Sequence, residues 1–237
     1  MNLELFLEQK ITFKYHDQLN QKIWADEKLK PEVKMKLIRI GQAWADFANI
    51  PSDSIKDVII VGGNANYNYT EYSDIDLHLV VDKNKLPDCP DLIDDYLRDK
   101  KQLWALTHDI KIYGHDVELY AEEEGIDRPS NQGVYSVKYN KWLAQPKYEN
   151  PEVDTKLLKK KTKDIMDKID LFISGKSNDI IEMKRLKEKL RQMRQAAIRK
   201  GGEFSLENLV FKELRNNGYL TKFSDYITSK QVKELSL

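Results

Sequence analysis

The sequence predicts a mixed α/β (α+β) fold for residues 1–150, followed by a helical domain over residues 151–237. Two short stretches have strand patterns: residues 57–61 form an almost continuous apolar run, and residues 75–81 alternate apolar and polar side chains. After Pro151 the strand patterns stop, and Lys, Leu, Ile, Glu and Arg recur at helical spacing. At 237 residues the chain is long enough for two small domains, each with its own core.

The first half contains two predicted helices and a predicted hairpin besides these strands. Pro31 suits the first position of a helix, and the apolar residues after it recur every three or four positions until about Asn49. Residues 91–106 predict a second helix, and residues 110–121 predict a β-hairpin with Gly114 in its turn. The stripe that would face the core in the first helix consists of Val33, Leu37, Ile40, Trp44 and Phe47.

The second half predicts three helices, over residues 153–174, 179–200 and 205–217. Gly175 and the Gly201-Gly202 pair are the stop signals between them, and Ser205 is a good N-cap for the third.

The formal net charge is +0, because 39 basic side chains balance 39 acidic ones. With 41% apolar residues, this composition excludes a disordered chain. The neutral total nevertheless combines two regions of opposite net charge. Residues 51–130 hold 8 basic and 18 acidic side chains, a net charge of −10, whereas residues 151–200 hold 15 basic and 8 acidic, a net charge of +7. A polyanionic substrate is therefore compatible with the neutral total.

The remaining composition points to a soluble, cytoplasmic protein. The single cysteine, Cys89, forms no internal disulfide and makes a cysteine-based zinc site improbable. Residues 1–8 carry acids where a signal peptide needs basic residues, and no apolar run reaches the roughly 20 residues of a membrane helix.

Two carboxylates follow the first predicted strand. That strand ends at Gly62-Gly63, a polar segment follows, and Asp74 and Asp76 then occupy positions i and i+2 at the start of the second strand. A strand repeats every two residues, so both side chains are expected on one face. Because two neighbouring carboxylates repel each other, bound divalent cations are the usual compensation, and oxygen ligands suit Mg²⁺ or Mn²⁺. The glycine pair would let backbone N–H groups approach an anion, and a helix beginning there would add its positive end.

A third carboxylate is expected on a neighbouring strand. Glu118 lies between apolar residues, as Asp76 does, and is preferred. Asp116 shares its face but lies nearer the turn, and is the alternative.

This pattern of an apolar strand, Gly-Gly, about ten residues, Ser-Asp-x-Asp and a later apolar-Glu-apolar strand resembles the DNA polymerase β-type nucleotidyltransferase superfamily. More closely, residues 72–81 and 117–120 are similar to small uncharacterised predicted nucleotidyltransferases of large tailed phages. The motif covers roughly residues 57–121. The resemblance implies a nucleotidyltransferase-type mixed β-sheet flanked by helices.

The same resemblance implies an activity and roles for individual residues. It implies transfer of a nucleoside monophosphate from a nucleoside triphosphate, with ATP the first candidate, to an acceptor hydroxyl with release of pyrophosphate. The acceptor is open, with RNA, including tRNA, among the candidates. Asp74, Asp76 and Glu118 would hold two Mg²⁺ ions, while Gly62, Gly63 and Ser73 would contact the phosphates.

Several other interpretations compete with this one. The Asp-x-Asp pair could be the solvated face of a strand, and the fold could be an inactive relative that only binds a nucleotide or a partner protein. Three His-Asp dipeptides resemble parts of HD-type phosphohydrolases, but two of them flank the predicted hairpin, whereas that chemistry needs helices. They begin at His16, His108 and His115.

Residues 174–177 end like a phosphate-binding loop but lack its earlier glycine and strand, so they are predicted to form a turn between helices. Two further features have open roles. The basic run over residues 184–200 is either a solvated helix face or a patch for a polyanion. Three aromatic side chains could stack on a base or pack in the core. They are Tyr135, Tyr139 and Trp142.

Overall fold

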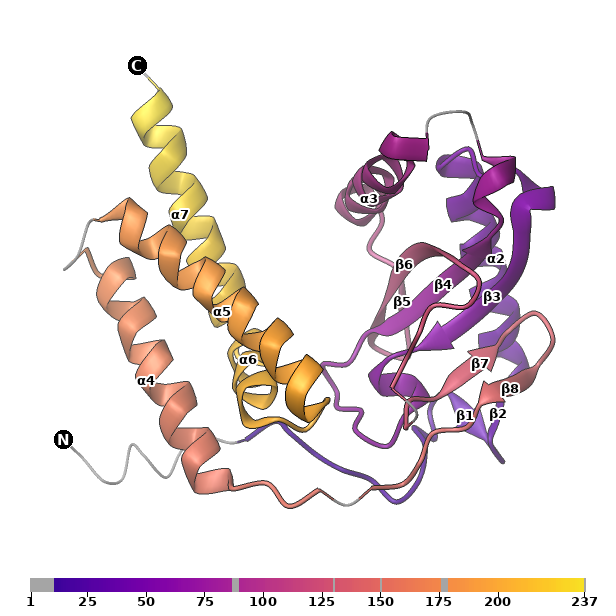
Figure 1. Ribbon diagram of the computed structural model, residues 1–237, viewed down its shortest axis with the longest axis horizontal. Helices are drawn as coiled ribbons and strands as arrows, with labels where there is room; N and C mark the ends of the chain where they lie inside the picture. Colours follow the sequence, from indigo (N-terminus) through magenta and orange to yellow (C-terminus); the bar gives the residue numbers. More distant parts are fainter. Residues whose placement is uncertain (1–10, 87–89, 130, 150, 176–178, 237) are drawn as a thin grey trace. The chain divides into compact units, whose positions relative to one another are not determined.

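The computed structural model describes residues 11–86, 90–129, 131–149, 151–175 and 179–236. The chain divides into two compact units, an α/β unit over residues 14–149 and a helical unit that combines residues 150–237 with residues 1–13 (Figure 1). The expected mixed α/β fold with a sheet flanked by helices and C-terminal helices is confirmed. The expectations for residues 1–8, Cys89 and residues 176–177 lie outside the described residues.

The α/β unit is built on a six-stranded sheet with the order β5-β6-β4-β3-β7-β8. Only β4 and β6 pair in parallel; the other neighbours are antiparallel, so the sheet is mixed. The helix α3 (Pro90–Thr107) lies in the connection between the two parallel strands, as a parallel pair requires. The strands are β3 (Ile55–Val61), β4 (Ile75–Val81), β5 (Lys111–Ile112), β6 (His115–Glu123), β7 (Val134–Ser136) and β8 (Lys141–Ala144).

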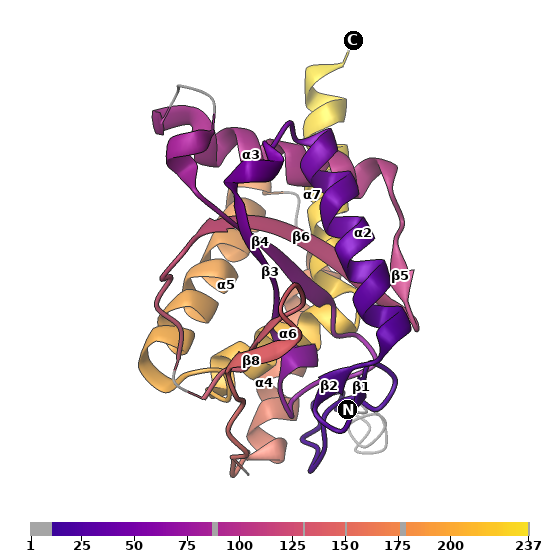
Figure 2. The ribbon, with the colours of Figure 1, turned by 90° about the vertical axis from the view of Figure 1, so that its right-hand side faces the viewer.

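One face of this sheet, which we call the covered face, packs against α2 (Pro31–Phe47) and α3 (Figure 2). The expected stripe of α2 is buried there, with Leu37 and Trp44 fully inaccessible. Helix and sheet approach closely at Gly41, where an added Cβ would lie 3.2 Å from Cδ2 of Leu79. The covered face carries Val58 and Ile60 from β3, Ile75, Leu77 and Leu79 from β4, and Leu119 from β6.

Four short strands were not expected from the sequence: β7, β8, β1 (Trp24–Ala25) and β2 (Lys28–Leu29). Aromatic packing holds them, because the Trp24 and Trp142 rings stack at 4.9 Å and both meet the Tyr135 ring edge-on. Two of the three candidate base-stacking aromatics, Tyr135 and Trp142, therefore pack with the core. The third, Tyr139, is 57% exposed.

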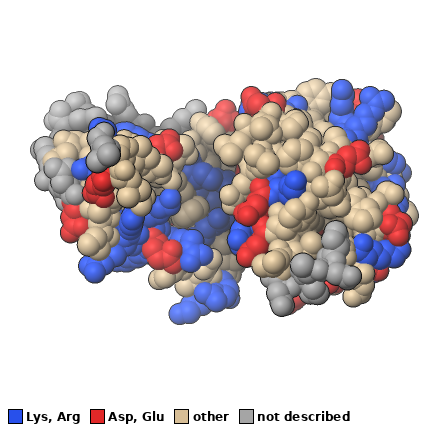
Figure 3. All heavy atoms as spheres, turned by 90° about the horizontal axis from the view of Figure 1, so that it is seen from above, with Lys and Arg blue, Asp and Glu red and all other residues tan. Residues whose placement is uncertain are grey.

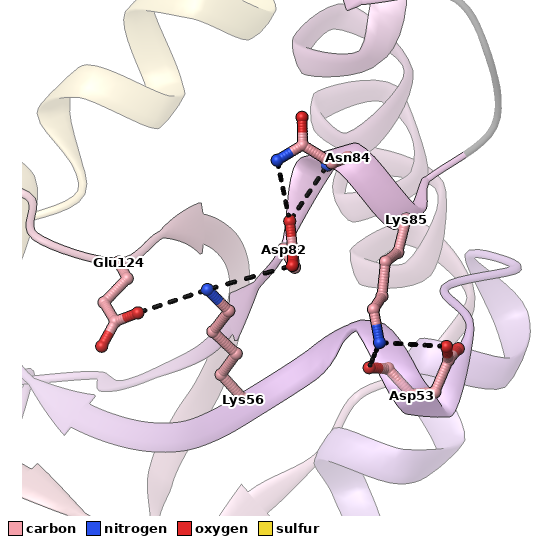
Figure 4. A network of polar contacts seen from close by, with 6 residues as sticks. All are labelled: Asp53, Lys56, Asp82, Asn84, Lys85 and Glu124. Carbon is pink, nitrogen blue, oxygen red and sulfur yellow. Dashed lines mark hydrogen bonds and ion pairs between the residues drawn. The ribbon is translucent and has the colours of Figure 1, made fainter.

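Polar contacts link the start of β3 with the residues that follow the end of β4 (Figure 4). The Lys85 ammonium donates to the Asp53 carbonyl at 3.0 Å and its carboxylate at 3.2 Å. The Lys56 ammonium lies 3.3 Å from Glu124 and 4.0 Å from Asp82. This network lies at the end of β4 opposite Asp76.

The helical unit contains the three expected helices, α4 (Thr155–Ile173), α5 (Ile180–Gly201) and α6 (Leu206–Asn216). It also contains α7 (Tyr219–Leu235), which was not expected and which begins directly after Gly218 in a left-handed conformation (φ +75°). Lys and Arg side chains cover much of the face of this unit that Figure 3 shows. No helix in the described part of the chain combines the length and apolar character needed to cross a membrane.

The N-terminal segment differs from the expected 1–150 domain. Backbone N–H groups of Thr12 and Phe13 donate to the Glu213 carboxylate at 2.8–3.0 Å, and Glu213 is only 3% exposed. The described residues before Lys14 therefore belong with α6, because they supply the donors that this buried carboxylate needs.

Candidate active site

The register between β4 and β6 brings two of the expected carboxylates together. Asp76 of β4 is the direct partner of Glu118 of β6 in this parallel pair. Alternation places both side chains on the face opposite the covered face, together with His78 and Tyr120; we call this the carboxylate face. Asp74 lies two residues before Asp76, immediately before β4 begins.

The glycine pair packs directly against this strand. Gly62 has φ +75°, and a Cβ added to it would overlap Oδ2 of Asp76. A Cβ added to Gly63 would lie 3.1 Å from the Ser73 hydroxyl, which accepts a hydrogen bond from the Thr70 N–H at 2.9 Å. Gly62, Gly63, Ser73 and Asp76 thus form one continuous surface.

The helix expected after the glycine pair is not a full helix. The chain makes a single 3-10 turn over Gly63–Ala65. The Asn66 side chain accounts for this, because its amide donates to the Gly62 carbonyl at 2.5 Å and accepts from the Gly133 N–H at 2.8 Å. Three residues are too few for a helix dipole, so the expected positive helix end is wrong.

Two side chains that the sequence did not single out meet Glu118. The Lys101 ammonium of α3 lies 3.0 Å from Oε2, and the Tyr120 hydroxyl donates to the same oxygen at 2.7 Å. The ammonium also lies 3.3 Å from the centre of the Tyr120 ring, a cation–π contact. Burial, followed by the charges of Glu118, Asp76 and Asp74, raises the pKa of Tyr120 far above its usual value, so the phenol stays protonated and donates.

The alternative carboxylate is placed differently. Asp116 is exposed and paired with Lys111, its partner across the β5–β6 hairpin. The register opposes Asp76 with Glu118 and not with Asp116, which favours Glu118 as the third carboxylate of the site.

A second polar cluster continues along the carboxylate face. Glu122 accepts from His78 at 2.6 Å and from Arg128 at 2.6 and 2.7 Å, and its side chain is 9% exposed. Burial alone would raise the pKa of Glu122, but the hydrogen bonds from His78 and Arg128 outweigh it and lower the pKa. The hydrogen bonds from His78 and Arg128 therefore already stabilise the negative charge of Glu122.

A buried network fixes the loop that carries Ser73 and Asp74. Asn64 donates to the Ser73 carbonyl at 3.1 Å and to the Asp74 carbonyl at 2.9 Å, and accepts from Asn20 at 2.9 Å. The Asn20 amide also donates to Nε2 of His115 at 3.0 Å, so Nδ1 of His115 carries the proton and donates to the Ser73 carbonyl at 2.6 Å. The backbone before the carboxylates is held in this way from two distant segments.

Within the residues that the structure describes, no three His, Cys, Asp or Glu side chains converge as a formed metal site. The donors nevertheless have the right chemistry for Mg²⁺ or Mn²⁺, because Asp74, Asp76 and Glu118 offer only oxygen ligands from one end of two adjacent strands. Oε2 of Glu118 is directed instead at Lys101 and Tyr120.

The three His-Asp dipeptides do not assemble a phosphohydrolase site. The His16 ring stacks on Tyr69 at 3.9 Å, and the His108 ring stacks on Trp104 at 3.6 Å. His115 belongs to the buried network of Asn20 and Asn64.

No protein-family model matches the sequence, and no curated protein matches it. Among solved structures, the STING-associated CdnE c-di-GMP synthase from Capnocytophaga granulosa aligns over 84% of both chains at 15% identity, with a TM-score of 0.23. The TM-score of 0.23 indicates little overall similarity between the two structures.

Proposed function

We propose that this chain is a metal-dependent nucleotidyltransferase of the polymerase β type. It would move a nucleoside monophosphate from a nucleoside triphosphate, with ATP as the first candidate, to an acceptor hydroxyl. The observation that carries the proposal is the in-register pairing of Asp76 and Glu118 on parallel strands, with Gly62 packed on the Asp76 carboxylate.

In the proposed reaction the acceptor oxygen forms a bond to the α-phosphorus and the bond between the α-phosphorus and the bridging oxygen breaks. Pyrophosphate leaves with that oxygen, and the acceptor proton passes to solvent. Divalent cations held by Asp74, Asp76 and Glu118 would neutralise the phosphate charge and polarise the reacting oxygens.

The chain's own groups have separate tasks in this proposal. The bare backbone of Gly62 and Gly63 lets the Asp76 carboxylate and the Ser73 hydroxyl pack directly against the loop, and a phosphate would bind beside these groups. Tyr120 orients the Glu118 carboxylate through its hydroxyl, and Lys101 supplies a positive charge at the same oxygen.

The charge of the helical segment bears on the nature of the acceptor. RNA, including tRNA, is the candidate favoured by the charge of residues 151–200, which hold 15 basic and 8 acidic side chains. Part of that charge is already paired within the helical unit, as between Arg191 and Glu188 at 2.8 Å.

The test measures pyrophosphate release from each labelled nucleoside triphosphate with Mg²⁺ and total RNA. Asp76→Asn should lower the rate by about 10²–10³-fold, the loss typical when an electrostatic group at a reacting centre is removed. Asp82→Asn, at the opposite end of β4, is the matched control and should retain activity. Full activity in Asp76→Asn would contradict the assignment.

The same assay identifies the third carboxylate. Glu118→Gln should abolish pyrophosphate release, whereas Asp116→Asn should leave it nearly unchanged, because Asp116 is exposed and paired with Lys111. The opposite result would move the third ligand to Asp116.

The second candidate function is a catalytically inactive nucleotidyltransferase-type fold that binds a nucleotide or a partner protein. It is favoured by one observation, the Lys101 ammonium lying at Glu118 where a cation would be needed. It predicts ATP binding that is equally tight in EDTA and in Mg²⁺, with no pyrophosphate release from any nucleoside triphosphate. Mg²⁺-dependent turnover would exclude it.

A further inference from the structure

A cavity of about 640 Å³ lies in the α/β unit, between α2, the C-terminal end of α3 and the segment that leads into β5. Its size is typical of small-molecule binding sites. Its wall is largely apolar: α2 contributes Val33, Ile40 and Ala43, and the opposite side contributes Trp104, Ile110 and Ile112.

This cavity is separate from the candidate active site. The helix α2 that forms one wall packs on the covered face, where Gly41 contacts Leu79. Asp76 projects from the other face of the same strand. A ligand in the cavity would therefore not compete with one at the carboxylates.

Packing holds the floor of the cavity in place. Val33 is 1% exposed, and Trp104 and Ile112 are each 7% exposed. The Trp104 ring is fixed by the stacked His108 ring and by Phe47, which meets it edge-on at 5.3 Å. Apolar groups that are already ordered lose little conformational entropy when a ligand binds.

The rim carries two basic side chains that could meet an anion. Lys36 and Arg39 lie one turn apart on α2 at the rim, and neither forms an ion pair with any residue that the structure describes. Of the other charged groups at the rim, Lys111 is paired with Asp109 and Asp116, while Glu32 accepts from the Tyr113 hydroxyl at 3.2 Å and keeps its negative charge.

We propose that this cavity binds a small amphipathic anion, with an apolar body against Trp104 and Val33 and one carboxylate or sulfonate group at Lys36 and Arg39. The largely apolar wall disfavours a nucleoside triphosphate, because several charged groups would lose their hydration there. A purely apolar molecule would forgo the attraction of the two cationic side chains.

The first experiment measures the fluorescence of 1-anilinonaphthalene-8-sulfonate bound to the folded protein and its displacement by dodecanoate. We expect one saturable site, from which dodecanoate displaces the probe more effectively than dodecanol does. Binding without saturation would overturn the proposal, and equal competition by dodecanol would overturn its anionic part.

Variants locate the site. Ala43→Phe places a ring in the cavity from an exposed helix position and should weaken dodecanoate binding at least about tenfold, or about 1.4 kcal/mol. Ala105→Phe makes the same change at an exposed position of α3 that does not line the cavity, and should leave binding unchanged. Equal affinities of the two variants would overturn the proposal.

Charge reversal tests the rim. Lys36→Glu combined with Arg39→Glu should weaken dodecanoate binding about tenfold at low salt and less at high salt, where surface charges are screened. Lys34→Glu, on the same helix but outside the cavity, is the control. An unchanged affinity in the double variant would overturn the assignment of the anion site.

A measurement on the unmodified protein avoids any dependence on variants. The chain has four tryptophans, so four indole N–H signals are expected in a nitrogen–proton correlation spectrum. Dodecanoate should shift the Trp104 signal and leave that of Trp24, whose indole N–H is bonded to the Asn64 carbonyl, in place. A stationary Trp104 signal would contradict binding in this cavity.

Discussion

The two faces of the central sheet are built from the same strands but are stabilised in different ways. On the covered face Ile75, Leu77 and Leu79 are at most 1% exposed and pack under α2 and α3. On the carboxylate face the intervening residues Asp76 and His78 are partly exposed and sit among charged partners. Burial of apolar area stabilises the whole first face, but on the second face it is limited to a small cluster of Ile59, Val61 and Val80. The rest of the second face holds repelling carboxylates in place with the help of Lys101 and Arg128.

This difference indicates that alternate residues of the same strand have different roles. The covered face keeps the sheet rigid, and so the carboxylate face can keep acids together whose mutual repulsion favours separation. Substitutions on the two faces should therefore differ in kind: one set changes stability, and the other changes ligand binding or pH dependence.

The largest effect on stability is expected from the covered face. Leu77→Ala removes a side chain that is fully inaccessible to solvent and should lower the free energy of unfolding by about 3 kcal/mol. Urea denaturation followed by circular dichroism measures the change. Asp76→Asn on the same strand is the comparison and should change the free energy of unfolding by less than about 1 kcal/mol; an equal loss in both variants would remove the distinction between the faces.

The next effect concerns the glycine loop. Gly62→Ala should lower the free energy of unfolding by about 2 kcal/mol, because the new methyl group overlaps Asp76 and the left-handed backbone conformation disfavours a side chain. Gly125→Ala is a matched control, with φ +84° but no atom within 4 Å of the added Cβ, and should cost only about 1 kcal/mol. Thermal unfolding of both variants separates the contact with Asp76 from the backbone strain.

A pH dependence distinguishes the second cluster of the carboxylate face. The pKa of Glu122 is lowered from 4.5, so its contribution to stability is fully present above about pH 4.5 and is lost as the pH falls through the lower folded value. Arg128→Ala removes one cause of the lowering and should reduce stability by about 1–2 kcal/mol at pH 7. The variant should also lose less stability than the unmodified protein as the pH falls below 4.5, which urea denaturation between pH 3 and 7 would reveal. An equally steep loss of stability below pH 4.5 in both proteins would contradict this role for Arg128.

The smallest effect is expected at Lys101. Lys101→Met removes the ammonium from Glu118 and should raise the affinity for Mn²⁺ about fivefold, because a cation then meets less repulsion at that carboxylate. Electron paramagnetic resonance of free Mn²⁺ measures the affinity without any turnover. Lys100→Met, whose ammonium lies over the Phe47 and Tyr96 rings instead, is the control; equal affinities would show that Lys101 does not oppose metal binding.

The sequence predicted the elements that have long or regular apolar patterns. The second strand was placed at residues 75–81, where β4 lies, and the helix at 91–106 agrees with α3 within one residue at each end. The short strands β1, β2, β7 and β8 were missed because two to four residues contain too little periodicity, and because their packing depends on Trp24 and Trp142 meeting across the fold. The helix α7 was missed because Gly218, a residue that usually follows the end of a helix, here directly precedes the first residue of the next one.

The candidate site was predictable only where it is local in sequence. Period-2 alternation was enough to place Asp76 and Glu118 on faces of their strands, and the same reasoning would have found Tyr120 two residues after Glu118. Lys101 reaches Glu118 from a helix 17 residues earlier, and Asn20 reaches His115 across 95 residues. No pattern in a single sequence identifies such contacts, because they depend on tertiary packing.

The parallel register of β4 and β6 has a consequence for how this chain can vary. A slip of one residue in the register of β6 would turn the Glu118 side chain to the covered face and place Val117 or Leu119 beside Asp76. The two carboxylates therefore cannot be separated in small steps by a shift of the strand. The segment between β4 and α3 is less restricted, since lengthening a loop costs little. Insertions and deletions should therefore accumulate there and be absent from α3 and from the strands themselves, and across related chains the pair should be either complete or lost.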